Sequence, residues 1–301
     1  MIAIHAGFVK TATSTLQRGV FSQHEGINFL GLPTQDDRLA GVIHAIAKAD
    51  SSCFDLMQIR ETFRHHLESG PAREVSLVSY ENFTLYESRD KGIIARRLKE
   101  VFGDCRIFFT MRRQEELVRA WYLQKLPKYI SGHNFLEFDD WLKLKMQEPH
   151  KSIIGDLDFN STIRYYEELF GRENVEVFLF EHLRQNAADF AQRMASWLGI
   201  DGARFAHLLA QAHYNPTITQ RQRDFGRFTT TYLPRFLTDR GARLLPRLLR
   251  KRFKRFLERG PSAKAPPSAA LDAWIADHCR SGNRALNARY GDQLARHGYT
   301  L

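Results

Sequence analysis

The residues best suited to chemistry lie near the start of this 301-residue sequence. Gly7 is followed, after two residues, by Lys10, and hydroxyl side chains dominate the next five positions: Thr11, Ala12, Thr13, Ser14 and Thr15. A helix that starts here presents unpaired backbone N–H groups and the positive end of its dipole, and both favour an anion. The lysine adds positive charge and the hydroxyls add donors. The segment predicts a loop that holds a phosphate-like anion, with a hydroxyl-rich helix cap that binds no ligand as the structural alternative.

The spacing of this loop disfavours a nucleoside triphosphate. The phosphate loop of ATPases and GTPases has four residues between its glycines and a glycine directly before its lysine, whereas Val9 precedes Lys10 here. A magnesium-dependent phosphoryl transferase also needs an aspartate near the end of a later strand to hold its ion. The next strands that the sequence predicts end near Glu81 and at Arg112 instead. These mismatches point away from ATP.

A parallel sheet would bring these residues together. Apolar runs predict strands at 2–6, 74–79, 106–111 and 175–180, and helical patterns follow at 11–21, 114–126, 162–170 and 187–198. Apolar strands separated by helices are typical of a parallel sheet covered on both faces, and sites in such folds gather at the carboxyl ends of the strands. We therefore predict a P-loop-like three-layer α/β fold with a helical C-terminal half.

The first loop resembles the 5′-phosphosulfate-binding loop of sulfotransferases that use 3′-phosphoadenosine 5′-phosphosulfate (PAPS). In that family a glycine, two residues and then Lys-Thr-Gly-Thr-Thr/Ser open the first helix. Ala12 stands here where the family usually has glycine, and an alanine suits that position if it is already helical. The resemblance implies that PAPS contacts seven loop residues: Gly7, Lys10, Thr11, Ala12, Thr13, Ser14 and Thr15.

Arg112 resembles the arginine with which this family binds the 3′-phosphate. In the family pattern that arginine ends a strand, a serine follows eight residues later, and a tyrosine lies two residues beyond the serine. A guanidinium can grip a phosphate with two donors while a hydroxyl completes the shell. Arg112 and Tyr122 match the pattern, but the serine position is Ala120. The missing donor costs about 1 kcal/mol unless Arg113, Arg119 or a backbone group compensates. A surface arginine paired with a nearby glutamate is the alternative.

Sulfuryl transfer to an alcohol needs a group that stabilises the leaving oxygen and a group that takes the alcohol's proton. The resemblance assigns the first role to Lys10. For the second we favour Glu81, which resembles a strand-end glutamate of carbohydrate sulfotransferases; a structural salt bridge or helix cap is its alternative role. His5 is the competing base, although a histidine in a strand is more often a hydrogen-bonded core residue. No metal is expected, and the implied acceptor is a hydroxyl of a glycan or glycolipid.

The net charge of +10 comes from one segment. Between Arg221 and Arg259, 13 lysines and arginines accompany 3 acidic residues, an excess equal to the charge of the whole chain. Leucines and phenylalanines recur at helical spacing in this basic segment, 221–259, with basic residues on the remaining faces. Such a helix suits an anionic membrane surface, and it would also suit a polyanionic acceptor or RNA. An apolar stripe packed on the domain, with a solvated basic face, is the structural alternative. No RNA-module signature accompanies it, so nucleic acid is not expected.

The whole chain is expected to form one sulfotransferase domain, 1–301, with a PAPS-binding core at 1–200 and a mostly helical extension at 201–301. Its start reads as a strand rather than a signal peptide, and no apolar run approaches the ~20 residues of a membrane span. Three scattered cysteines suggest neither disulfides nor zinc. We expect a cytoplasmic enzyme, with peripheral contact at the inner face of the membrane as an option. An ATP-dependent small-molecule kinase and a non-enzymatic membrane- or nucleic-acid-binding module are the rival hypotheses.

Overall fold

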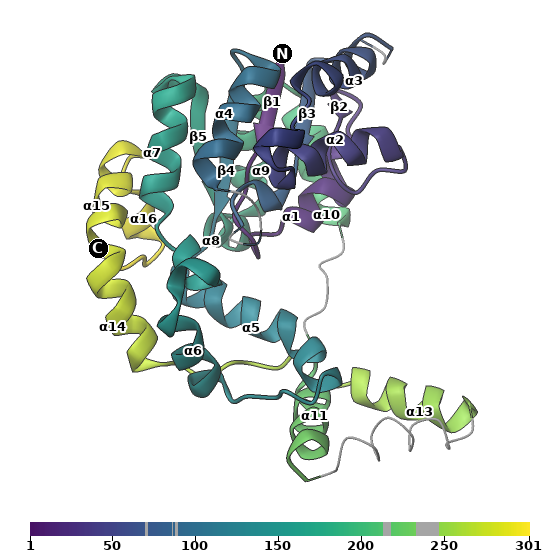
Figure 1. The fold of residues 1–301 in the computed structure, drawn as a ribbon, viewed down its shortest axis with the longest axis vertical. Helices are drawn as coiled ribbons and strands as arrows, with labels where there is room; N and C mark the ends of the chain where they lie inside the picture. Colours follow the sequence, from purple (N-terminus) through teal and green to yellow (C-terminus); the bar gives the residue numbers. More distant parts are fainter. Residues whose placement is uncertain (70–71, 86, 88–89, 213–217, 233–246) are drawn as a thin grey trace.

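The computed structural model describes residues 1–69, 72–85, 87, 90–212, 218–232 and 247–301 (Figure 1). Five parallel strands form one sheet in the order β2-β3-β1-β4-β5. The strands are β1 (Ile2–His5), β2 (Ile27–Phe29), β3 (Val75–Ser79), β4 (Arg106–Met111) and β5 (Val175–Leu179). The four strands that the sequence predicts are confirmed, and β2 is an additional short strand at the sheet edge.

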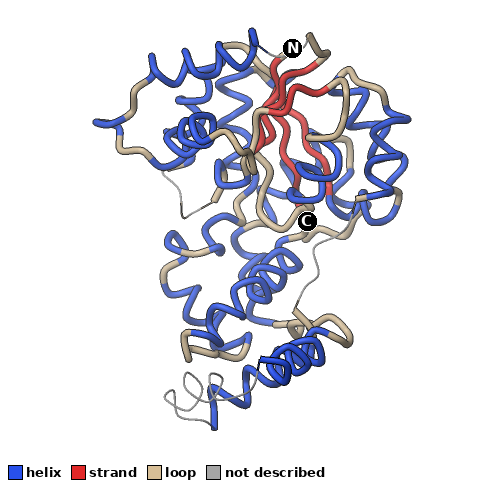
Figure 2. The backbone as a smooth tube through the Cα atoms, turned by 90° about the vertical axis from the view of Figure 1, so that its right-hand side faces the viewer, coloured by secondary structure: helices blue, strands red, loops and turns tan. Residues whose placement is uncertain are grey.

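Helices cover both faces of the sheet, so the α/β fold of three layers is confirmed (Figure 2). Alternate strand residues face opposite layers: Ile107 and Phe109 join one core cluster, and Phe108 joins the other. The first layer contains α2 (Asp37–Lys48), α3 (Leu56–Ser69), α4 (Lys91–Phe102) and α7 (Phe159–Phe170). The second contains α1 (Thr13–Leu16), which continues as a π-helix at Gln17–Phe21, together with α9 (Ala187–Leu198) and α10 (Gly202–Gln211).

The rest of the described chain is mostly helical; most of it lies below the carboxyl ends of the strands in Figure 1, while its last two helices lie beside α7. Its helices are α5 (Gln114–Ser131), α6 (Phe138–Gln147), α11 (Gln220–Tyr232), α13 (Arg247–Glu258), α14 (Ala269–His278), α15 (Arg280–Arg289) and α16 (Gln293–Arg296). The short α8 (Phe180–Gln185) follows β5, and single 3-10 turns occupy Ser51–Cys53, Glu81–Phe83, Pro149–Lys151, Ile153–Asp156 and Arg172–Asn174. None of the described helices is long and apolar enough to span a bilayer.

Strand pairing places the predicted site residues at one edge of the sheet. β1 is the central strand and pairs in parallel with β3 on one side and β4 on the other. The carboxyl ends of these three strands therefore lie side by side. The anion loop follows β1, Glu81 follows β3 and Arg112 follows β4, so the fold gathers all three at this edge.

Candidate active site

The loop between β1 and α1 has a strained backbone. It first runs beside β4, where the N–H of Phe8 donates to the carbonyl of Thr110 at 3.0 Å. Lys10 and Ala12 then have φ angles of 64° and 65°, in the left-handed region, which costs a residue with a Cβ atom about 1–2 kcal/mol. The expectation that Ala12 is already helical was wrong, because Ala12 is the left-handed N-cap and α1 begins at Thr13.

This backbone makes a cradle for an anion. A left-handed residue followed by a right-handed one turns successive N–H groups toward the same side, as in anion-binding nests. Ala12 and Thr13 form such a pair. The N–H groups of Thr13, Ser14 and Thr15 belong to the first helical turn, where no carbonyl one turn earlier can accept them. The loop thus offers backbone donors to an anion without a glycine at position 12.

The hydroxyls of the loop differ in their availability. The Thr11 hydroxyl is buried, donates to the carbonyl of Phe8 at 2.6 Å and lies 2.6 Å from Oγ1 of Thr110. It therefore ties the loop to β4, which contradicts its predicted use as a side-chain donor to the cofactor. Ser14 is half-buried, and its hydroxyl makes no hydrogen bond within the part of the chain that the structure describes. Ser14 is thus the hydroxyl best placed for a ligand.

The Lys10 ammonium and the Glu81 carboxylate both lie at this edge of the sheet and influence each other electrostatically. Neither the Lys10 ammonium nor the Glu81 carboxylate forms a hydrogen bond or ion pair of close range with another described residue. Burial lowers the pKa of Lys10, an effect that Glu81 opposes and Arg112 reinforces. Burial likewise raises the pKa of Glu81, against the charges of Lys10 and Lys125. Two poorly solvated, mutually interacting ionisable groups are the kind of pair found at reaction sites.

Arg112 lies between the loop and the start of α5. Its Nη1 donates to the carbonyl of Lys10 at 3.3 Å, and its Nη2 contacts Glu116 at 3.1 Å. The guanidinium also lies 4.6 Å from the ring centre of Phe180. The glutamate pairing that was the structural alternative is therefore present. Even so, the buried Nε–H of Arg112 has no acceptor among the described residues, so one donor remains for an anion.

The predicted hydroxyl partners on α5 do not reach this site. Tyr122 is fully buried, its hydroxyl donates to the carbonyl of Leu136 at 2.8 Å, and its ring packs against Phe138 and Trp141. These contacts fasten α5 to α6 and contradict the predicted contact of Tyr122 with the cofactor. Ala120 supplies no donor from its side chain.

Arg119, one position before Ala120 on α5, shares an acidic partner with Arg112. Its Nη1 lies 3.4 Å from Glu116, the same carboxylate that pairs with Arg112. Its Nε–H is buried and has no acceptor within the described residues. Arg112 and Arg119 share this carboxylate with Arg113, whose Nη2 lies 3.7 Å from it. Arg112 and Arg119 each keep an unused Nε–H, which suits a second anion beside the loop.

His5 is placed in the core rather than beside a substrate. Its Nδ1 lies 2.8 Å from Oγ of Ser79, and its Nε2 lies 3.0 Å from Oγ1 of Thr110. The ring is fully buried, stacks on Phe108, and its burial lowers the pKa of His5 to about 3. With both nitrogens occupied, the ring has no position for an acceptor's proton. The structure therefore contradicts the role of competing base, and Glu81 remains the candidate.

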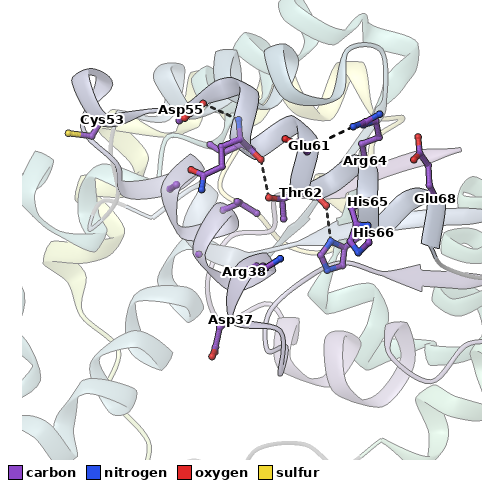
Figure 3. Close-up of a pocket in the computed structure, with 15 residues that line it drawn as sticks. Asp37, Arg38, Cys53, Asp55, Glu61, Thr62, Arg64, His65, His66 and Glu68 are labelled. Carbon is purple, nitrogen blue, oxygen red and sulfur yellow. Dashed lines mark hydrogen bonds and ion pairs between the residues drawn. The ribbon is translucent and has the colours of Figure 1, made fainter.

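A separate surface pocket of about 850 Å³ lies between α2 and α3 (Figure 3). Its lining includes none of the loop residues, Glu81 or Arg112. Its polar groups largely bond to one another: His66 is held by the carbonyl of Thr62 and by Asp36, both at 2.8 Å. Within the described ranges, no group of three histidine, cysteine or acidic residues could hold a metal ion. Among the described residues, Lys10, Glu81 and Arg112 at the strand ends therefore remain the candidate reactive groups.

No protein-family model and no curated protein matches this chain. Solved sulfotransferase structures do resemble its fold. One from Alicyclobacillus acidocaldarius is 16% identical over 66% of this chain and 81% of its own, with a TM-score of 0.47. A mouse sulfotransferase complexed with adenosine 3′,5′-bisphosphate (PAP) is 12% identical over 98% of this chain and 84% of its own, with a TM-score of 0.39. The sulfotransferase domain from the curacin biosynthetic pathway is 12% identical over 92% of this chain and 96% of its own, with a TM-score of 0.45. Likeness this distant carries no argument about activity, which rests on the site.

Proposed function

We propose that this chain transfers a sulfuryl group from PAPS to a hydroxyl of an acceptor by in-line displacement. The observation that carries the proposal is the meeting of Lys10, Glu81 and Arg112 at the strand ends, each with a donor or acceptor unused by the described residues. The hydrogen bond from Arg112 to the carbonyl of Lys10 joins two anion-binding positions. Two linked positions suit a nucleotide that carries anionic groups on both its 5′ and 3′ oxygens, as PAPS does.

Each residue then has a defined part in the reaction. Glu81 takes the proton of the acceptor hydroxyl, the oxygen forms a bond to sulfur, and the bond between sulfur and the bridging oxygen of the 5′-phosphate breaks. Lys10 and the first-turn N–H groups stabilise the charge that grows on that oxygen. Arg112 and Arg119 hold the 3′-phosphate. The products are the sulfated acceptor and adenosine 3′,5′-bisphosphate (PAP). The raised pKa of Glu81 makes it a stronger base than an exposed glutamate.

The acceptor class rests on the sequence resemblance alone, which favours a hydroxyl of a glycan or glycolipid. The second candidate function is an ATP-dependent small-molecule kinase on the same scaffold. The loop disfavours it, because Val9 rather than glycine precedes Lys10 and because Glu81 and Arg112 stand at strand ends where a magnesium enzyme would want an aspartate.

Calorimetric titration with PAP and with ATP-Mg²⁺ tests the proposal. We expect wild type to bind PAP and to prefer it over ATP-Mg²⁺, and we expect Lys10→Ala to weaken PAP binding by about tenfold or more, as loss of a charge-assisted contact predicts. Lys143→Ala, which removes an exposed lysine from α6, is the matched control and should bind as wild type does. Equal indifference of wild type to both nucleotides would contradict the sulfotransferase proposal.

We further propose that α11 and α13 contact an anionic membrane surface, which would place the enzyme at the cytoplasmic face of a membrane. The two helices lie at the end of the molecule farthest from the sheet (Figure 1). Exposed aromatic rings connect the two helices: the ring centres of Phe225 and Phe253 are 5.0 Å apart. Phe256 is 53% exposed, and the guanidinium of Arg221 lies over its ring. The alternative in which the apolar stripe packs onto the domain does not account for these exposed rings. Residues 233–246 of the basic segment lie outside the described residues.

Vesicle sedimentation tests this contact. Wild type should bind vesicles of phosphatidylserine and phosphatidylcholine but not of phosphatidylcholine alone, because both basic charge and interfacial aromatics contribute. The double variant Phe253→Ser, Phe256→Ser should lose most of this binding while keeping PAP affinity. Unchanged vesicle binding by that variant, or none by wild type, contradicts the membrane proposal and leaves the nucleotide proposal intact.

A further inference from the structure

A continuous chain of buried polar side chains runs through the sheet beneath the anion loop. We define it as the buried relay, and its members are Gln17, Ser79, His5, Thr110 and Thr11. Successive polar atoms along it lie 3.0, 2.8, 3.0 and 2.6 Å apart. No member is more than 7% exposed. Polar groups in such a core are costly unless every one is satisfied, and a satisfied network fixes a single arrangement.

The contacts fix where each hydrogen of the buried relay lies. Thr11 must donate to the carbonyl of Phe8, because a carbonyl has no hydrogen to give. Thr110 must then donate to Thr11, so Nε2–H of His5 donates to Thr110. In a neutral imidazole the other nitrogen, Nδ1, is then an acceptor, and the hydroxyl of Ser79 donates to it. The amide of Gln17 donates to Ser79 and completes the chain.

The buried relay grips the anion loop at its most strained part. Its last member, Thr11, stands between the two left-handed residues, Lys10 and Ala12. The loop also packs directly on the imidazole: a Cβ atom added to Gly7 would lie 2.3 Å from Nε2 of His5. Strained backbone of this kind persists where surrounding contacts over-determine it. The hydrogen bonds that start at His5 supply such contacts.

We propose that His5 is a positioning residue that, through Thr110 and Thr11, holds the anion loop in its left-handed form before a ligand arrives. The imidazole touches no substrate and takes no proton from one. It keeps the cradle preformed, so that an anion does not have to order the loop on binding. This inference rests on the proposed function in one respect, because PAP is the ligand whose affinity reports the state of the loop.

Nitrogen NMR of histidine tests the hydrogen assignment without any ligand. We expect the His5 ring, identified as the resonance that Thr110→Val shifts, to be the neutral Nε2–H tautomer. It should not titrate between pH 5 and 8, because the ring is buried among uncharged neighbours: Ser79, Thr110, Phe21 and Phe108. An Nδ1–H tautomer, or titration near neutral pH, would overturn the proposal whether or not the protein binds PAP.

The effect of His5→Phe in wild type and in Ala12→Gly tests whether His5 holds the loop in its left-handed form. His5→Phe keeps the stacked ring and removes both hydrogen bonds, and we expect it to weaken PAP binding about tenfold. In an Ala12→Gly background the same change should cost threefold or less, because glycine adopts the left-handed form unaided. Val177→Ala, in β5 of the same sheet, is the control for general destabilisation and should leave PAP affinity unchanged. Equal losses in both backgrounds would reduce His5 to an ordinary core residue and overturn the proposal.

Two further readouts cover the remaining outcomes. If His5→Phe does not fold, Thr110→Val breaks the same chain with nearly the same shape and carries the same expectation. If wild type does not bind PAP, the proposed function fails, but the positioning role is still read from amide hydrogen exchange at Phe8 and Leu16, whose N–H groups donate to the carbonyls of Thr110 and Ala12. Exchange there should accelerate in Thr110→Val and stay slow in Val177→Ala; unchanged exchange would overturn the role of His5.

Discussion

The left-handed conformation of Ala12 gives a sharp test of the loop, since glycine should be tolerated there better than at any ordinary alanine. Ala12→Gly removes a Cβ atom that costs about 1–2 kcal/mol at a φ of 65°. The same change loses a half-buried methyl group and frees the unfolded chain, which together cost about 1 kcal/mol. The net effect on the free energy of unfolding should therefore lie between zero and about 1 kcal/mol of stabilisation.

Ala45→Gly is the matched control, because Ala45 is also half-buried but lies inside α2 with ordinary helical geometry. It loses the same methyl group and the same chain stiffness without relieving strain, so it should destabilise by about 1 kcal/mol. The difference between the two variants isolates the strain at position 12 and should be about 1–2 kcal/mol, or about 2–5 °C in melting temperature. Thermal and urea unfolding measure it. Equal destabilisation by both substitutions would refute the left-handed assignment.

Three further substitutions test the assigned roles. Glu81→Gln should lower kcat by about 10²–10⁴ and leave PAP affinity unchanged, because it removes the base but no nucleotide contact. The wild-type rate should fall as the pH drops through the raised pKa of Glu81, since the base must be ionised. An unchanged kcat in Glu81→Gln would remove Glu81 from the mechanism. Arg112→Lys should weaken PAP binding about tenfold or more in calorimetry, because an ammonium lacks the planar set of donors, and wild-type affinity would argue against a phosphate there. Tyr122→Phe should leave PAP binding unchanged and cost about 1 kcal/mol of stability, from its lost bond to Leu136; weaker PAP binding would restore the role that the structure removes from Tyr122.

The sheet was predictable from sequence because its strands are short apolar runs between helices. β2 has only three residues, Ile27–Phe29, which is too short for an apolar pattern to predict as a strand. Pairing with β3 makes this segment a strand. The gathering of Lys10, Glu81 and Arg112 followed from parallel pairing alone. Any sheet that placed these strands next to each other would bring the three residues to one edge.

The finer details of the site were not predictable, for two physical reasons. Side chains say little about left-handed backbone when the residue is not glycine, so Ala12 was expected to be helical. The face of α5 that points to the site depends on what packs against it. A motif counted in residues placed Tyr122 beside Arg112, but Phe138 and Trp141 of α6 draw its ring into the core. The signal for the buried relay was present only as polar residues, Ser79 and Thr110, near the ends of apolar strands.

The chain differs at two alanines, Ala12 and Ala120, from the sulfotransferase pattern that its sequence resembles, and different neighbours compensate at each position. At position 12 an alanine adopts the left-handed conformation, and the hydroxyl of Thr11, itself bonded to Thr110, holds this strained backbone in place. At position 120 the alanine offers no donor, and Arg119 stands one residue away with an Nε–H unused by the described residues. The first compensation preserves the shape of the loop and the second preserves the charge and donors of the second anion position. Arg112 donates to the carbonyl of Lys10, which is itself left-handed, so the anion loop and the second anion position at Arg112 form one arrangement. A ligand that engages both needs the loop already in its left-handed form.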